Sequence, residues 1–166
     1  MQNPFFNIGE FPDFPKMTPE AADEALPKLL ADARARVDEL EKTAEPTWEG
    51  LVRALDDAQH PLYQAWGIVS HMQSVCNSDA WRKIEEKYQG DLVAFSLRVG
   101  QSKRFYELTK QLRERLGSKA GRDGAPSPSA GGGVPSLSLG APRLRILDKM
   151  IQGADLAGVA LEGDRQ

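Results

Sequence analysis

Few residues of this 166-residue chain could bind a metal or transfer a proton. The only histidines are His60 and His71, and neither is followed by glutamate. The H-E-x-x-H motif of zinc hydrolases places two histidines four residues apart on one helix face, with the glutamate as general base for the metal-bound water. On a straight helix His60 and His71 would lie roughly 16 Å apart, too far to share one ion unless a kink at Pro61 folds the segment back. The sequence therefore predicts no catalytic residue and no metal ligand.

Other reactive residue types do not form a site either. Asp56-Asp57 and Glu85-Glu86 are adjacent pairs, and neighbours on a helix point in different directions, so neither pair can act as a carboxylate dyad. Cys76 is the only cysteine, so we expect no disulfide framework and no cysteine-based zinc knuckle. It lies on an apolar stripe, so we expect a small buried side chain, with a reactive thiol as the alternative. Gly131–Gly133 is not followed by Lys-Ser or Lys-Thr, so no phosphate-binding loop is predicted.

Composition and charge narrow the class of protein. The net charge is -3, and no cluster of Lys and Arg interleaved with aromatic residues is present, so we expect no nucleic-acid partner. No apolar run approaches the roughly 18 residues that a membrane helix needs, and the first residues lack the basic and apolar regions of a signal peptide. We therefore expect a soluble, cytoplasmic protein without a membrane partner, with an organelle as the alternative location.

The elements that would position any site are amphipathic helices. From Trp48 to Val99 apolar residues return at steps of three or four on both sides of a polar joint, 77–79, which predicts two antiparallel helices. Ser78 or Asp79 would cap the second helix. The first stripe contains Leu51, Leu55, Ala58, Leu62, Trp66, Val69, Met72 and Cys76, and the second contains Trp81, Ile84, Tyr88, Leu92, Phe95 and Val99.

A preceding helix is predicted to begin at Thr18-Pro19-Glu20, where a hydroxyl cap is followed by proline and a carboxylate. Pro27 should kink or restart this helix, and Glu45-Pro46 should end it, with Thr47 capping the next one. At His60-Pro61 a kinked continuous helix is favoured, with two helices as the alternative. The stripe of the preceding helix contains Ala22, Leu26, Leu29, Ala33, Val37 and Leu40.

The chain on either side of these helices is expected to differ in character. Residues 1–17 combine prolines with Phe5, Phe6, Phe11 and Phe14, which predicts an extended arm pinned by its rings, or a frayed terminus. After Val99 a fourth stripe contains Phe105, Leu108, Leu112 and Leu116. Arg113 and Arg115 are predicted to lie near its C-terminal end, where their positive charges would interact favourably with the helix dipole.

The remaining residues divide into a low-complexity segment and a last helix. Residues 117–142 are rich in Gly, Ser and Pro and cannot bury enough apolar surface to offset the entropy of ordering, so they predict a flexible, disordered insert. Leu144, Leu147, Ile151 and Ala154 predict a helix that Gly158 would cap. Residues 162–166 are predicted to be the first turn of a truncated element.

These predictions combine into an all-α fold, an antiparallel bundle of about four helices. Its parts would be an extended arm over 1–17, a helical bundle over 18–116, a flexible insert over 117–142, and over 143–166 a last helix followed by the truncated element.

The sequence also resembles a known family along most of its length. The resemblance is densest at Thr47-Trp48-Glu49, at Leu51 and Leu55, and from Ala65 to Ser78. It begins near Asn3-Pro4, includes 11–12, 18–20 and 99–101, and resumes from Arg143, where 156–161 is similar to a family turn. On these residues the chain resembles the N-terminal helical region of the oligopeptidase A and thimet oligopeptidase family of zinc metallopeptidases. Residues 117–142 depart from the family pattern, either as a surface insertion or as sequence that does not belong in the mature protein.

The resemblance implies an indirect function. The family encloses a deep channel between helical lobes and cleaves short peptides inside it, and this chain would be the N-terminal lobe that walls the channel. A missing C-terminal catalytic lobe would be its partner and would hold the zinc, since this chain has no cofactor site of its own and should hydrolyse nothing alone. The alternative is a stand-alone, non-catalytic helical interaction module derived from that lobe.

Overall fold

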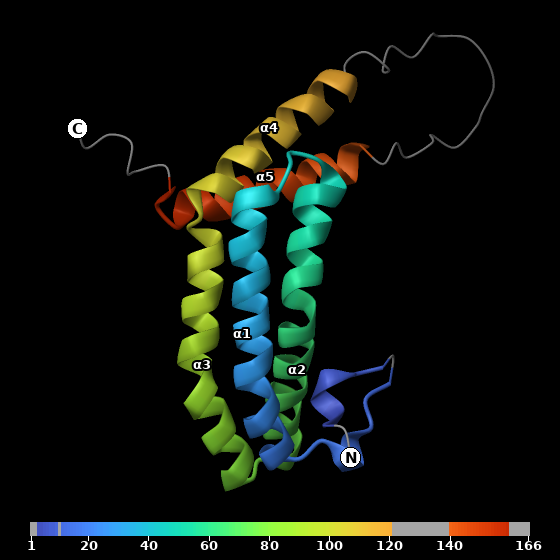
Figure 1. Ribbon diagram of the computed structural model, residues 1–166, viewed down its shortest axis with the longest axis vertical. Coiled ribbons are helices and arrows are strands. Elements are labelled where there is room, and N and C mark those ends of the chain that lie inside the picture. The colour runs from blue at the N-terminus through green and yellow to red at the C-terminus, as the bar shows by residue number, and fades with distance from the viewer. Residues whose placement is uncertain (1–2, 10, 121–139, 160–166) are drawn as a thin grey trace, which may run out of the picture. The chain divides into compact units, whose positions relative to one another are not determined.

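Helices make up the long elements of the computed structural model, which describes residues 3–9, 11–120 and 140–159 (Figure 1). No strand occurs in the part of the chain so described, and the all-α prediction is confirmed. The α-helices are α1 (Pro19–Thr43), α2 (Ala54–Cys76), α3 (Asp79–Gly100), α4 (Lys103–Ala120) and α5 (Gly140–Leu156). Two 3-10 turns, η1 (Pro4–Phe6) and η2 (Phe14–Lys16), precede α1, and a π-helical segment, η3 (Trp48–Arg53), leads into α2.

The chain forms two compact units. The first comprises Met1–Ala44 and Val52–Val99, and the second Glu45–Leu51 and Gly100–Gln166. This grouping differs from the single bundle of about four helices predicted over 18–116, because α4 belongs with α5 and not with α1, α2 and α3. Apolar spacing identifies the face that a helix buries, but it does not identify the helix that covers that face.

In the first unit α1, α2 and α3 lie side by side (Figure 1). Asp23 of α1 contacts Tyr88 of α3, and Asp38 further along α1 contacts Arg98 further along α3, so these two helices run parallel. The chain reverses at the joint between α2 and α3, where Asn77 has a left-handed φ of 43°, and α2 is therefore antiparallel to both. The largest fully buried side chains contributed by these helices are Leu26, Val37, Leu62, Val69 and Phe95.

Predicted caps fix the helix starts. The hydroxyl of Thr18 accepts a hydrogen bond from the Ala21 amide at 3.2 Å, and that of Ser78 accepts one from the Trp81 amide at 3.4 Å. Each bond satisfies one of the first-turn amides that have no partner within the helix. The cap predictions for Thr18 and Ser78 are confirmed.

Interior prolines interrupt neither α1 nor α2. Helix α1 is continuous through Pro27 and α2 is continuous through Pro61. The predicted restart at Pro27 is therefore wrong, and at Pro61 the continuous helix is confirmed over two separate helices. The apolar stripe keeps its phase across each proline, so packing of both halves offsets the one backbone hydrogen bond that proline removes.

The N-terminal arm contains the turns η1 and η2, and it buries one of its four phenylalanines. Phe5 is 2% exposed, whereas Phe11 is 85% exposed, and Phe6 and Phe14 are also exposed. The side chain of Asn3 accepts from the Phe5 amide at 3.0 Å and donates to the Ala21 carbonyl oxygen at 2.8 Å. Asn3 thereby ties the arm to the first turn of α1.

In the second unit α4 and α5 form an antiparallel pair. The Tyr106 hydroxyl donates to Asp155 at 2.8 Å, and Arg113 Nε donates to Asp148 at 2.7 Å, so earlier residues of α4 contact later residues of α5. Fully or nearly fully buried side chains of this unit are Leu51, Phe105, Leu108, Leu112 and Leu147.

Residues 48–51, the first part of η3, belong to the same unit. The Thr47 hydroxyl accepts from the Gly50 amide at 3.0 Å, which confirms the predicted cap. The guanidinium of Arg143, on α5, lies 4.8 Å from the centre of the Trp48 ring, a cation–π distance.

Both ends of the predicted insert are helical. Helix α4 continues to Ala120 and α5 begins at Gly140, so the insert predicted over 117–142 is wrong at its boundaries, and 121–139 lie outside the described residues. A helix anchored by buried leucines can include Gly117 because an interior glycine costs only about 1 kcal/mol.

Because α4 extends to Ala120, Arg113 and Arg115 lie further from its C-terminal end than predicted. Arg113 binds Asp148, and Arg115 donates to the Pro46 carbonyl oxygen at 3.2 Å. Their predicted place near the C-terminal end of the helix is thereby corrected. Beyond α5, Gly158 has a φ of 88° and its amide donates to the Asp155 carbonyl oxygen, as expected of a helix cap. Residues 162–166, predicted as a truncated element, lie outside the described residues.

Candidate functional site

The two histidines are exposed on α2. The His71 ring lies 5.5 Å from the ring of Phe14, with the two planes tilted by 49°, so it packs against the N-terminal arm. In the ranges 3–9, 11–120 and 140–159, no group of three or more His, Cys, Asp or Glu side chains could hold a metal ion. The described residues therefore do not fit a zinc site.

The adjacent carboxylates and the cysteine also lie at the surface. Asp56, Asp57 and Glu86 are exposed, and Glu85 is partly exposed. Cys76 is exposed, so its predicted burial is wrong. Apolar spacing identified the correct helix face, but the buried part of that face ends at Val69, and the last turn of α2 borders solvent.

One polar cluster of the first unit joins α1 to α3. The Tyr88 hydroxyl lies 2.6 Å from the Asp23 carboxylate and 3.1 Å from its carbonyl oxygen, and Lys87 Nζ donates to the same carboxylate at 2.5 Å. Hydrogen bonds from Lys87 and Tyr88 hold the pKa of Asp23 below its ordinary value. Burial, followed by the hydrogen bond to Asp23, raises the pKa of Tyr88.

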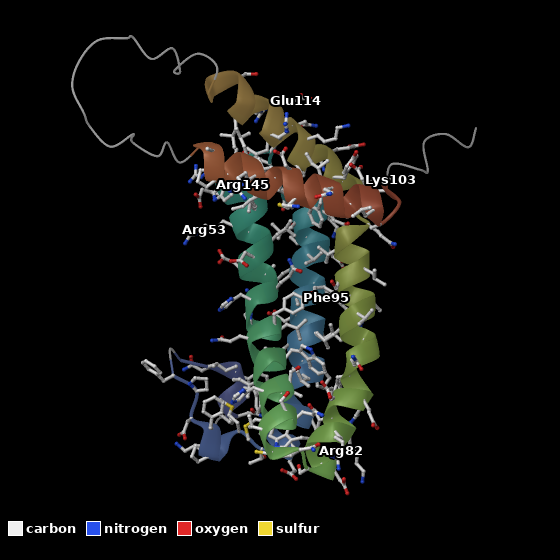
Figure 2. The ribbon with its side chains drawn as sticks, turned by 180° about the vertical axis from the view of Figure 1, so that it is seen from behind. Arg53, Arg82, Phe95, Lys103, Glu114 and Arg145 are labelled. Carbon is white, nitrogen blue, oxygen red and sulfur yellow. The ribbon has the colours of Figure 1, made fainter. Side chains whose placement is uncertain are left out.

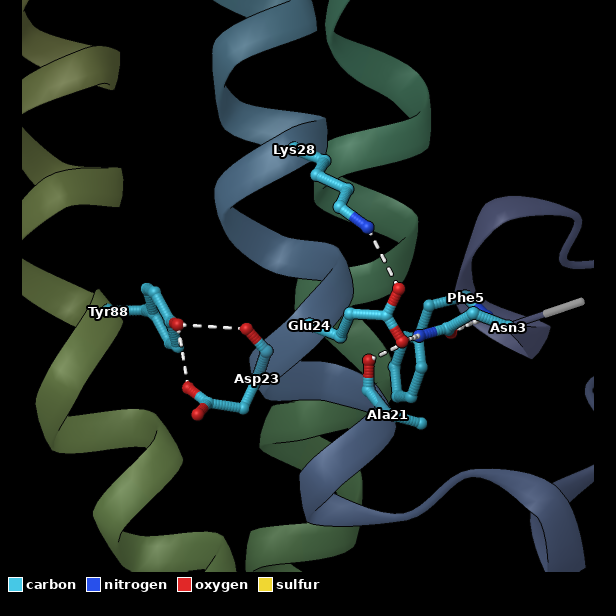
Figure 3. A network of polar contacts seen from close by, with 7 residues as sticks. All are labelled: Asn3, Phe5, Ala21, Asp23, Glu24, Lys28 and Tyr88. Atoms are coloured by element: carbon cyan, nitrogen blue, oxygen red, sulfur yellow. Dashed lines mark hydrogen bonds and ion pairs between the residues drawn. The ribbon is translucent and has the colours of Figure 1, made fainter.

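A second cluster connects the arm to α1 (Figure 3). Glu24 accepts from Lys28 Nζ at 2.8 Å and from the side-chain amide of Asn3 at 3.2 Å. These two bonds lower the pKa of Glu24, the one from Lys28 having the larger effect. Lys28 Nζ also lies 5.4 Å from the centre of the Phe6 ring.

Both clusters stabilise the fold and are unsuited to acid catalysis. A general acid needs a carboxyl pKa raised toward the working pH, whereas Asp23 and Glu24 have lowered pKa values and stay ionised. The contact between Asp23 and Tyr88 could not be identified from the sequence, because the two residues are 65 positions apart and no short-range pattern connects them. The one available signal was a tyrosine on an apolar stripe, whose buried hydroxyl requires a partner.

Among the described residues, no helix combines the length and the apolar character that a membrane-spanning helix requires.

Comparisons with known proteins identify the family. Residues 26–120, more than half of the chain, match the family model described as "Neurolysin/Thimet oligopeptidase, N-terminal domain". The chain is 31% identical over 164 residues to the probable cytosolic oligopeptidase A of Arabidopsis thaliana, an alignment that covers 99% of this chain and 21% of the relative. The organellar oligopeptidase A of the same plant, chloroplastic and mitochondrial, is also 31% identical over 164 residues, covering 99% of this chain and 18% of the relative.

A bacterial relative gives a similar result. Oligopeptidase A of Escherichia coli is 28% identical over 167 residues, which covers 100% of this chain and 22% of the relative. The chain thus spans about a fifth of the length of the curated relatives that it matches. The resemblance inferred from residues 47–78 and the flanking segments is confirmed, and the chain belongs to the neurolysin and thimet oligopeptidase N-terminal domain family.

Proposed function

We propose that this chain is the N-terminal, channel-wall lobe of a zinc metalloendopeptidase that hydrolyses short peptides. In this role the helices form one wall of an enclosed channel and keep folded proteins out of it, while polypeptide outside these 166 residues carries out the reaction. The lobe would contribute shape and support, and its own side chains would take no part in proton transfer.

The observation that carries the proposal is the pattern of coverage. The alignments to the two Arabidopsis oligopeptidases cover 99% of this chain but only 21% and 18% of the relatives. A chain that matches one domain of a larger peptidase over nearly its whole length is expected to perform the task of that domain.

In this enzyme the zinc would bind outside the described part of this chain. The sequence has no H-E-x-x-H motif, and His60 and His71 are exposed on α2 without a third ligand among the described residues. When bound, zinc would supply an activated water and polarise the scissile carbonyl, and the described part of this chain offers no ligand set for it.

Detection of the endogenous protein with an antibody raised against residues 18–116 tests the proposal. A band several-fold heavier than 18.3 kDa, with chelator-sensitive peptide cleavage in the immunoprecipitate, is the expected result. The purified 166-residue chain should not cleave the same peptides. A single band at 18.3 kDa would contradict the proposal and favour the stand-alone interaction module.

We further propose that the lobe works in the cytoplasm. One relative is named as cytosolic and another as chloroplastic and mitochondrial, so both compartments occur among similar proteins. Cell fractionation with the same antibody distinguishes them. Recovery of the antigen in an organelle fraction, protected from added protease, would contradict a cytoplasmic location.

A further inference from the structure

Helix α5 has apolar residues on two sides. Asp148 and Asp155 contact α4, and the buried Leu147 and Ala154 each precede one of these aspartates by one position, so they lie on the side of α5 that packs against α4. A surface helix normally needs only one such apolar side. The residues on the other side of α5 therefore require an explanation.

The other side consists of Pro142, Arg145, Ile146, Lys149 and Met150, which line a shallow, open groove and which we call the outer face of α5. Their spacing of three or four residues places them along one side of the helix. Ile146 is 45% exposed, Pro142 is exposed, and Met150 is partly exposed. An exposed apolar strip along one helix is typical of a surface that packs against another polypeptide.

The outer face of α5 also carries two cations one helical turn apart. Arg145 and Lys149 are both exposed, and neither forms an ion pair with a carboxylate in the described ranges. Lys149 Nζ instead donates to the neutral side chain of Gln152 at 3.1 Å. Figure 2 places Arg145 on the N-terminal half of α5. The face thus combines an apolar centre with positive charge that the described part of the unit leaves unneutralised.

We propose that the outer face of α5 docks an amphipathic helix with acidic edges, contributed by the catalytic portion of the same peptidase. This inference rests on the proposed function, because it takes the occupant from the roughly four fifths of the relatives' length that this chain does not span. An apolar strip on that helix would cover Ile146 and Met150. Its carboxylates would pair with Arg145 and Lys149, as complementary charges do at interfaces.

Charge also argues against a second copy of this chain as the occupant. In a two-fold symmetric dimer the same surface meets itself, so two outer faces of α5 would oppose each other. Arg145 and Lys149 of one copy would then approach the same cations of its partner, and like charges at an interface disfavour association. The same two cations favour an acidic helix.

The test uses a chimera with two separate measurements. Residues 1–166 replace the matching segment of the Arabidopsis cytosolic oligopeptidase A, with a specific protease site directly after residue 166. Peptide cleavage by the intact chimera reports on the proposed function. After cutting at the junction, the dissociation constant of the two pieces, measured by analytical ultracentrifugation, reports on docking.

Two substitutions address the face and two serve as controls. Ile146→Glu places a charge in the apolar centre and Arg145→Glu reverses a charge at its edge, and each should raise the dissociation constant by about tenfold or more. Leu97→Glu, at a residue of α3 that is 52% exposed, and Lys83→Glu, at another exposed residue of α3, should leave it unchanged. Because all four side chains are at least partly exposed on helices, circular dichroism should show that each variant folds.

The outcomes separate the two proposals. An inactive wild-type chimera would count against the proposed function. An active chimera whose pieces separate at once, or bind equally well with Ile146→Glu and Arg145→Glu, would overturn only the docking. The docking is also overturned if the free chain elutes at twice 18.3 kDa and Ile146→Glu abolishes that dimer, since the occupant would then be a second copy.

Discussion

The two units of this chain differ in the number of helices that enclose their apolar residues. In the first unit, three helices direct their stripes toward one another, and Phe95 of α3 lies near Tyr63 of α2, with the ring centres 6.5 Å apart. In the second unit α4 and α5 share a single interface, and α5 has a second apolar side in contact with solvent. Three helices can enclose a core, whereas two helices cover only one side of each other. The second unit therefore has more to gain from a partner.

The two units also differ in how far their polar contacts are shielded from solvent. The link between α1 and α3 includes the buried Tyr88, whose hydroxyl needs the Asp23 carboxylate as a partner. The link between Arg113 and Asp148, which joins α4 to α5, has both side chains half exposed. Solvent weakens exposed pairs, so the polar contacts should stabilise the first unit more than the second.

The largest predicted effect concerns the core of the first unit. Phe95 is 1% exposed, and Phe95→Ala should lower the free energy of unfolding by about 3–5 kcal/mol, because the deleted ring leaves a cavity. Val93→Ala, at a residue of the same helix that is 51% exposed, is the matched control and should change little. Urea unfolding followed by circular dichroism measures both. Equal losses for the two variants would mean that the core has been assigned incorrectly.

A smaller effect is expected from the core of the second unit. Leu147 on α5 is fully buried, and Leu147→Ala should cost about 2–3 kcal/mol, near the lower end for such substitutions because a two-helix unit can relax around the cavity. Amide hydrogen exchange should show faster exchange in α4 and α5 with little change in α1, α2 and α3. Leu156→Ala, at an exposed residue of the same helix, is the control. Uniform loss of protection would mean that the two units unfold together.

Much of this fold could be predicted from apolar spacing and cap residues. The stripe over Trp81, Ile84, Tyr88, Leu92 and Phe95 is buried throughout, and the caps at Thr18, Thr47 and Ser78 form as expected. These features depend on neighbours within about one helical turn, which a single sequence displays directly.

Features that depend on distant neighbours could not be predicted in the same way. Cys76 follows the stripe of α2 but is exposed, and α4 packs with α5 although its stripe resembles those of the first three helices. The Asp23–Tyr88 contact is another example, since neither residue indicates the other. For the candidate site, the sequence alone showed that no H-E-x-x-H motif is present. The outer face of α5 could be identified only after the structure showed which side of α5 packs against α4.

A third prediction concerns the polar link between α1 and α3. Tyr88→Phe removes one hydrogen bond to a carboxylate that is itself partly exposed, so it should cost about 1 kcal/mol or less at pH 7. Asp23→Asn should flatten the acid side of the stability profile. Because the folded pKa of Asp23 is lowered from 3.8, its contribution is present above pH 3.8 and is lost as the pH falls through the folded pKa.

Thermal unfolding across pH 2–7 measures this effect. The wild type should lose more stability than Asp23→Asn toward the acid end of that range, while the two profiles run parallel at neutral pH. Asp56→Asn, at an exposed residue of α2, is the matched control and should retain the wild-type acid profile. Identical profiles for the wild type and Asp23→Asn would mean that the Asp23 carboxylate does not contribute to stability.

The smallest effect is expected where the exposed polar link joins α4 to α5. Arg113→Gln removes the ion pair with Asp148, whose formation raises the pKa of Arg113 through a hydrogen bond and the nearby negative charge. The midpoint of thermal unfolding should fall slightly at low salt, and the difference from the wild type should disappear at high salt because exposed charges are screened. Arg145→Gln, on the outer face of α5, removes a cation without an ion pair in the described chain and should leave the midpoint of the free chain unchanged. Arg113→Gln could instead lower the unfolding midpoint as much as Tyr88→Phe does, and the difference could persist at high salt. That result would show that the second unit depends on its polar contacts as strongly as the first. The contrast between the two units would then rest on their apolar surfaces alone.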